Sequence, residues 1–88
     1  IMYKMAWINT NSVIYHMESV REPVFEDMVT LVGGHIVRTL CVFEGKERII
    51  LVDEEGEHKD LDLNYNASQM CDQVILGNAL ILIDFDFE

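Results

Sequence analysis

The chain alternates short apolar segments with clusters of turn-forming residues, a pattern that limits it to short strands and helices. Residues 2–9 and 13–19 are both enriched in β-branched and aromatic side chains, and the polar residues Thr10, Asn11 and Ser12 separate them. Two such segments joined by a short polar turn are typical of a β-hairpin. We therefore expect a pair of antiparallel strands over residues 2–19.

A single segment of the first half has helical spacing. Apolar residues recur with a helical period between Val24 and Val32, directly after Pro23, and proline is favoured in the first turn of a helix. Gly33 follows the last apolar residue, where glycine ends helices because it adopts the left-handed conformation without a steric penalty. The pattern predicts a short amphipathic helix over residues 24–32, followed by a new strand after Gly34.

Three more strands are expected between residues 35 and 63. Residues 35–43 form the first, and the unbroken apolar run within residues 48–52 predicts a central strand that is covered on both faces. The segment 53–56 begins with Asp53 and ends with Gly56, as in a type I turn that closes with a glycine bulge. We expect a second hairpin here, with a return strand over residues 57–63 that buries Leu61 and Leu63.

A second helix is indicated after this hairpin. Asn66 precedes Gln69 by three residues, the spacing of a capping box, so we expect Asn66 to cap a short helix that ends near Cys71. Apolar segments over residues 73–76 and 79–87 complete the pattern. A chain of 88 residues can bury one core. The sequence thus predicts one α+β domain over residues 1–88, with a mainly antiparallel sheet of five to six strands and two short helices.

Charge is the most unusual bulk property of the chain. There are 16 Asp and Glu against 6 Lys and Arg, which gives a net charge of −10. Such a surface repels phosphate, so direct nucleic-acid binding and binding to anionic membranes are not expected. It attracts a protein with a basic surface and speeds the encounter with it. The residues expected to bind such a partner are the acids of the second predicted hairpin: Asp53, Glu54, Glu55, Glu57, Asp60 and Asp62.

The two cysteines and the first residues of the sequence bear on the compartment. Cys41 and Cys71 lie in apolar segments and are too few for a disulfide scaffold, which is typical of buried thiols in a reducing cytosol. We see no signal-peptide pattern and no apolar run near the roughly 20 residues that a membrane span needs. A cytoplasmic location is therefore expected.

The sequence carries no pattern of catalytic chemistry. It contains no nucleophile elbow, phosphate-binding loop or dinucleotide fingerprint. His16, His35 and His58 are not paired with each other or with a cysteine at the short spacings of a zinc site. We expect that the protein is not an enzyme and that it needs no metal or cofactor.

Several short motifs, taken in order, resemble the domain of unknown function 3846 family. They are Leu-Val-Gly-Gly-His-Ile at 31–36, Leu-Val-Asp-Glu-Glu-Gly at 51–56, Leu-Asn at 63–64, Ala67, and Ile-Leu-Gly-Asn-Ala-Leu-Ile at 75–81. The resemblance implies a small standalone protein of the kind found in bacteriophages, bacteria and some large DNA viruses. The family has no general assigned activity, so the resemblance implies a viral context and no chemistry.

Three functions stay open on these observations. The first is a phage- or virus-like acidic accessory protein that binds and inhibits a host defence or nucleic-acid-processing protein. The second is a module that sequesters a nucleotide-like small molecule near the Gly-Gly turn, through His35, Arg38 and Asn64. The third is a structural protein that forms homo-oligomers, with residues 83–87 as an exposed edge strand.

Overall fold

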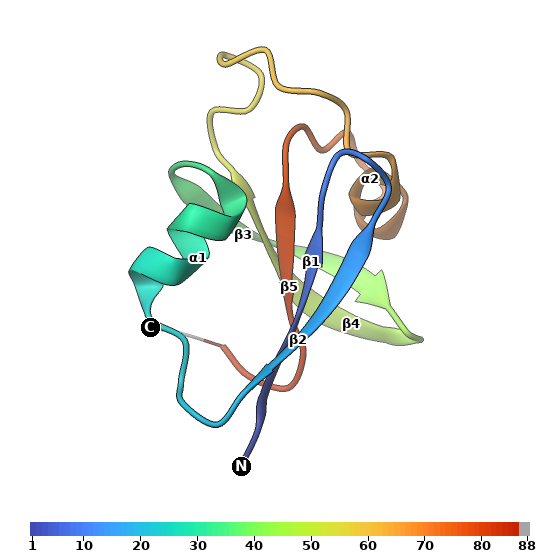
Figure 1. The fold of residues 1–88 in the computed structure, drawn as a ribbon. Coiled ribbons are helices and arrows are strands. Elements are labelled where there is room, and N and C mark those ends of the chain that lie inside the picture. The colour runs from blue at the N-terminus through green and yellow to red at the C-terminus, as the bar shows by residue number, and fades with distance from the viewer. Residues whose placement is uncertain (87–88) are drawn as a thin grey trace.

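Five antiparallel strands form the sheet of the computed structural model, which describes residues 1–86 (Figure 1). The strands lie in the order β2-β1-β5-β4-β3, and two helices accompany them. The predicted α+β class, with a mainly antiparallel sheet and two short helices, is confirmed. The elements are β1 (Tyr3–Ile8), β2 (Ile14–Ser19), α1 (Phe25–Val32), β3 (Ile36–Phe43), β4 (Lys46–Asp53), α2 (Tyr65–Cys71) and β5 (Ala79–Leu82).

The two helices cover opposite faces of the sheet (Figure 1). Because side chains alternate along a strand, β5 sends Ala79 and Ile81 to the face of α2, and Leu80 and Leu82 to the face of α1. Each face then has its own apolar core. The core under α2 contains Ala6, Ile8, Ile50, Val52, Ala67, Ile75 and Ile81, and the core under α1 contains Met5, Met28, Val32, Leu51, Leu80 and Leu82.

The elements predicted for the first half of the chain agree with the structure. The β1–β2 hairpin pairs Tyr3 with Ser19, and α1 ends at Gly33, whose φ of 100° is left-handed. A different hairpin from the one predicted at 53–63 joins β3 to β4 through a turn at Glu44 and Gly45. Strand β4 lies between β5 and β3 and is buried over its last four residues, so the prediction of a central, doubly covered strand is confirmed.

The predicted return strand over residues 57–63 is wrong. Strand β4 already has β3 on one side and β5 on the other, so no edge is left for another partner. The segment instead closes local turns, in which the amides of Lys59, Asp60 and Leu61 donate to carbonyls three to five residues earlier. Only Leu63 forms a bridge, an isolated one with Leu76.

The helix cap and the last strand also differ from the predictions. Asn64, two residues before Asn66, caps α2 through its side-chain oxygen, which accepts the amide of Ala67 at 3.1 Å. The strand expected over residues 79–87 ends at Leu82, and it is the central strand of the sheet and not an edge. All four of its residues are buried, because both helices pack over it. Phe87 and Glu88 lie outside the described residues.

Candidate functional site

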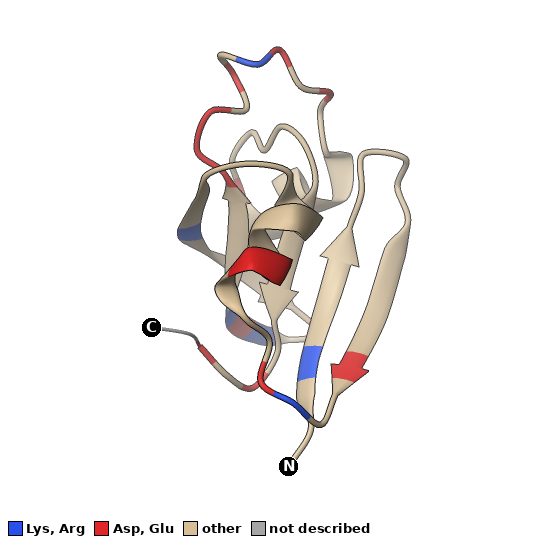
Figure 2. Cartoon of the chain, turned by 60° about the vertical axis from the view of Figure 1, so that its left-hand side comes forward, with Lys and Arg blue, Asp and Glu red and all other residues tan. Residues whose placement is uncertain are grey.

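The strongest concentration of exposed charge lies on residues 54–62, which we call the acidic loop. The loop leaves the end of β4 and protrudes from the body of the protein, and Figure 2 shows acidic residues along it. Its turns are held by short local bonds, among them the one from the amide of Lys59 to the carbonyl of Glu55 at 2.9 Å. Five carboxylate side chains of the loop are exposed: those of Glu54, Glu55, Glu57, Asp60 and Asp62.

A partly buried ion pair anchors the loop to the sheet. Nζ of Lys59 lies 2.7 Å from Oδ2 of Asp53, whose side chain is fully buried. Oδ1 of Asp53 accepts the amide of Glu55 at 2.8 Å. Burial alone raises the pKa of Asp53, but the hydrogen bonds from Lys59 and Glu55 and the positive charge of Lys59 outweigh it, so that the pKa is lowered. Asp53 is therefore an internal anchor, whereas the other five predicted acids are exposed.

Two glycines leave space for close contacts, Gly34 beside the anchor and Gly56 beside the segment before β5. A Cβ atom on Gly34 would lie 2.6 Å from Oδ2 of Asp53 and would also clash with Nζ of Lys59. A Cβ atom on Gly56 would lie 3.0 Å from the carbonyl oxygen of Leu76. Gly56 does not have a positive φ, so the predicted glycine bulge is wrong. A side chain at position 56 would crowd the backbone of Leu76, because the loop and the segment before β5 approach each other closely there.

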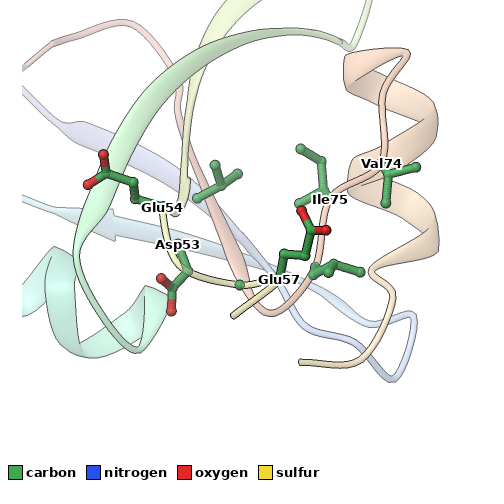
Figure 3. A pocket seen from close by; sticks show the side chains of 8 residues that line it. Asp53, Glu54, Glu57, Val74 and Ile75 are labelled. Atoms are coloured by element: carbon green, nitrogen blue, oxygen red, sulfur yellow. The ribbon is translucent and has the colours of Figure 1, made fainter. Parts of the chain in front are cut away.

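An open hollow of about 510 Å³ lies beside the acidic loop. In Figure 3 the carboxylate of Glu57 points toward Ile75, while the carboxylates of Glu54 and Asp53 point away from it. Val74 contributes an apolar wall and is 74% exposed. The hollow thus combines carboxylate oxygens with accessible apolar carbon, and this combination suits the aliphatic stem and charged end of a lysine or arginine side chain.

The three residues predicted for nucleotide binding do not form a common site. The side chain of His35 is 80% exposed and lies near Glu55, with Nδ1 and Oε1 3.6 Å apart. Arg38 is paired with Asp86, with 3.1 Å between Nε and Oδ1. Asn64 is completely buried, and its amide donates to the carbonyls of Ile8 and Gly77 while its oxygen accepts from Ala67. The Asn64 side chain is therefore committed to internal bonds.

Lys59 and Val74 are the site residues that sequence reasoning missed. Lys59 is the only Lys or Arg within the acidic run 53–62. Its position among acids could have indicated an ion pair with one of them. Val74 carried no such sign, because its exposure results from the tertiary course of the chain after α2.

Metal binding and thiol chemistry have little support in residues 1–86. No group of three or more His, Cys, Asp and Glu side chains is placed there to hold a metal ion. Burial raises the pKa of Cys41 to about 11, with nearby Cys71 adding to the effect, and burial also raises the pKa of Cys71. Both thiols are therefore poor nucleophiles near neutral pH. Over the same residues, no helix has the length and apolar character needed to cross a membrane.

Comparison with protein-family models, with curated proteins and with solved structures finds no match to this chain. The resemblance to the domain of unknown function 3846 family therefore stays a prediction.

Proposed function

We propose that this protein is a non-catalytic binding protein that recognises a basic protein surface through its acidic loop. The observation that carries the proposal is the anchored display of charge: five exposed carboxylates on one protruding segment whose base is fixed by the Asp53–Lys59 pair. The proposed contact residues are Glu54, Glu55, Glu57, Asp60 and Asp62.

Electrostatic complementarity explains how such a loop acts. The net charge of −10 attracts a cationic partner over the range that salt permits, which is about 8 Å at physiological ionic strength. Once the partner docks, an anchored loop loses less conformational freedom than a flexible one, so more of the interaction energy is kept as affinity. The hollow beside Glu57 and Val74 then accepts a lysine or arginine side chain.

The biological consequence we propose is inhibition. A small acidic protein that covers a basic functional surface blocks whatever that surface binds, including nucleic acid. This fits the viral context that the family resemblance implies, and we propose a host defence or nucleic-acid-processing protein as the target and the host cytoplasm as the location. The nucleotide-binding alternative has less support, since Asn64 is buried and Arg38 is paired with Asp86.

A binding titration with matched variants tests the proposal. The probe is a fluorescent oligolysine peptide, and the loop variant carries Glu54→Gln, Glu57→Gln and Asp60→Asn. The control removes the same number of charges elsewhere, through Glu18→Gln, Glu22→Gln and Glu26→Gln, all exposed in the structure.

The loop variant should bind the probe about tenfold more weakly than the control, because three exposed charge contacts are each worth about 0.5 kcal/mol. Its affinity should also depend less steeply on salt. Equal affinities of the loop variant and the control would contradict the proposal, because they would show that only the total charge matters.

A further inference from the structure

Strand β3 is an edge of the sheet that lacks the usual protection. It is eight residues long, and among the residues that the structure describes it pairs only with β4. Three of its apolar side chains are exposed, Val37 by 41%, Leu40 by 54% and Val42 by 59%. Natural edge strands are commonly short, charged or interrupted by proline, which prevents pairing with another chain. The opposite edge, β2, has six residues and carries His16 and Glu18. Strand β3 carries one charged residue, Arg38, which is paired with Asp86. By length and exposed apolar surface, β3 is the edge more open to pairing.

The register of β3 shows which backbone groups face outward. The amide of Glu54 donates to the carbonyl of His35 at 2.8 Å, so the carbonyl of His35 points toward β4. In an antiparallel ladder this direction alternates along the strand. The backbone groups of Ile36, Leu40 and Val42 therefore point away from β4. Within residues 1–86, no other element forms a backbone hydrogen bond with these three.

A hollow next to this edge can receive a side chain from an added strand. It measures about 380 Å³ and lies between β3, β4 and residues 84–86. Leu40 and Ile49 contribute apolar surface to it. Its charged lining is mixed, with three carboxylates and two cations: Glu47, Asp84, Asp86, Lys46 and Arg48. Strand addition uses both features, since main-chain bonds give affinity and pockets for alternate side chains give specificity.

Charge identifies the occupant of the edge. The two arginines beside it are paired, Arg38 with Asp86 and Arg48 with Asp84. At the β3–β4 turn the two exposed acids Glu44 and Glu47 outnumber the one exposed cation, Lys46. A second copy of the chain also carries a charge of −10 and is repelled, whereas a cationic segment is attracted. We infer that β3 accepts an extended segment with alternating basic and apolar residues, which adds as a sixth strand. This inference rests on the proposed function and names a second contact with the same basic partner.

The test uses the whole protein and a pair of synthetic peptides. The first is an eight-residue peptide in which lysine and valine alternate. The second has the same sequence and charge but is N-methylated at alternate residues, which removes the donors that pair with β3. Loss of two or three main-chain bonds should weaken binding of the methylated peptide by about tenfold to a hundredfold. The unmethylated peptide should also protect the amides of Ile36, Leu40 and Val42 from hydrogen exchange.

A protein variant provides the reciprocal test. Val42→Pro removes an outward amide without removing a bond to β4, and proline is tolerated at such edge positions. It should reduce binding of the unmethylated peptide by about fivefold or more, through one lost bond and one lost side-chain contact. The matched control is His16→Pro, an outward position on the opposite edge, which should bind like the wild type.

The outcomes separate this inference from the proposed function. Equal binding of both peptides, with dependence on the acidic loop retained, would overturn strand addition and leave the loop proposal intact. If a glutamate-valine peptide binds as tightly as the lysine-valine peptide, and methylation still weakens its binding, the partner is not selected by positive charge. This result would overturn both proposals. A dimer of the protein alone that Val42→Pro dissociates would identify a second copy as the occupant and would also overturn the inference.

Discussion

Replacing Asn64 by alanine gives the sharpest test of how the loop and α2 are joined to the sheet. Asn64 is completely buried and makes three side-chain hydrogen bonds. Its amide group donates to the carbonyl of Ile8 at 3.0 Å and to that of Gly77 at 2.9 Å. Its oxygen caps α2 by accepting the amide of Ala67 at 3.1 Å. The side chain thus connects β1, the turn before β5 and the helix.

The expected loss of stability follows from these three bonds. Loss of an N-cap costs about 1 kcal/mol. Each of the other two bonds is worth about 1 kcal/mol, and more where a buried carbonyl is left without a partner. Asn64→Ala should therefore lower the free energy of unfolding by at least about 3 kcal/mol, a large share of the roughly 5 to 15 kcal/mol typical of a domain. The melting temperature should fall by about 12 to 24 °C.

The control is the same substitution at Asn66, the residue that the sequence pattern favoured as the cap. Asn66 lies in α2 but does not cap it, so Asn66→Ala should change the stability by less than about 0.5 kcal/mol. Urea unfolding followed by the fluorescence of Trp7, the only tryptophan, measures both variants. Equal losses in the two variants, or a larger loss for Asn66→Ala, would refute the assignment of Asn64 as cap and connector.

Three further predictions concern the anchor and the thiols. Asp53→Asn should destabilise the protein at about pH 7, and the difference in stability from wild type should vanish as the pH falls. A carboxyl with a lowered folded pKa stabilises fully above its unfolded pKa of about 3.9 and loses this effect as the pH drops through the folded pKa. Urea titrations from about pH 2 to about pH 7 measure this difference in stability. Cys41 should react with iodoacetamide at about pH 8 at least about a hundredfold more slowly in the folded protein than in urea, because its raised pKa leaves little thiolate. Mass spectrometry follows the reaction over time, and similar rates in the two conditions would contradict the burial of the thiol. Gly34→Ala should destabilise the protein by about 1 to 3 kcal/mol, because the added methyl group collides with Lys59. The loss of stability should be smaller when Lys59→Ala is also present. Additive losses in a double-mutant cycle would exclude this contact.

Local patterns predicted much of the fold. The apolar period and Gly33 placed α1 within one residue of its start, and the polar segment 10–12 marked the first turn. The unbroken apolar run at 49–52 identified β4 as an internal strand, because only a strand covered on both faces is apolar at every position. These signals are local, and tertiary contacts reinforce them.

The errors arose where long-range contacts override local patterns. Alternation at Leu61 and Leu63 resembled a strand, but β4 had no free edge to pair with it. Asn66 and Asn64 both carry a capping side chain, and the bond from the amide of Asn64 to the carbonyl of Ile75 helps decide between them. The same limit applies to the site. The run of acids was visible in the sequence, while the burial of Asp53 depends on its tertiary pairing with Lys59.

The most direct test of the proposed function is to map where a cationic peptide binds. The protein, labelled with ¹⁵N, is titrated with an oligolysine peptide at physiological salt, and the amide chemical shifts are followed by NMR. The account predicts that the largest shifts fall on the acidic loop and around Val74. Shifts spread evenly over all exposed acids, or centred on the acids of α1 at Glu26 and Asp27, would contradict it.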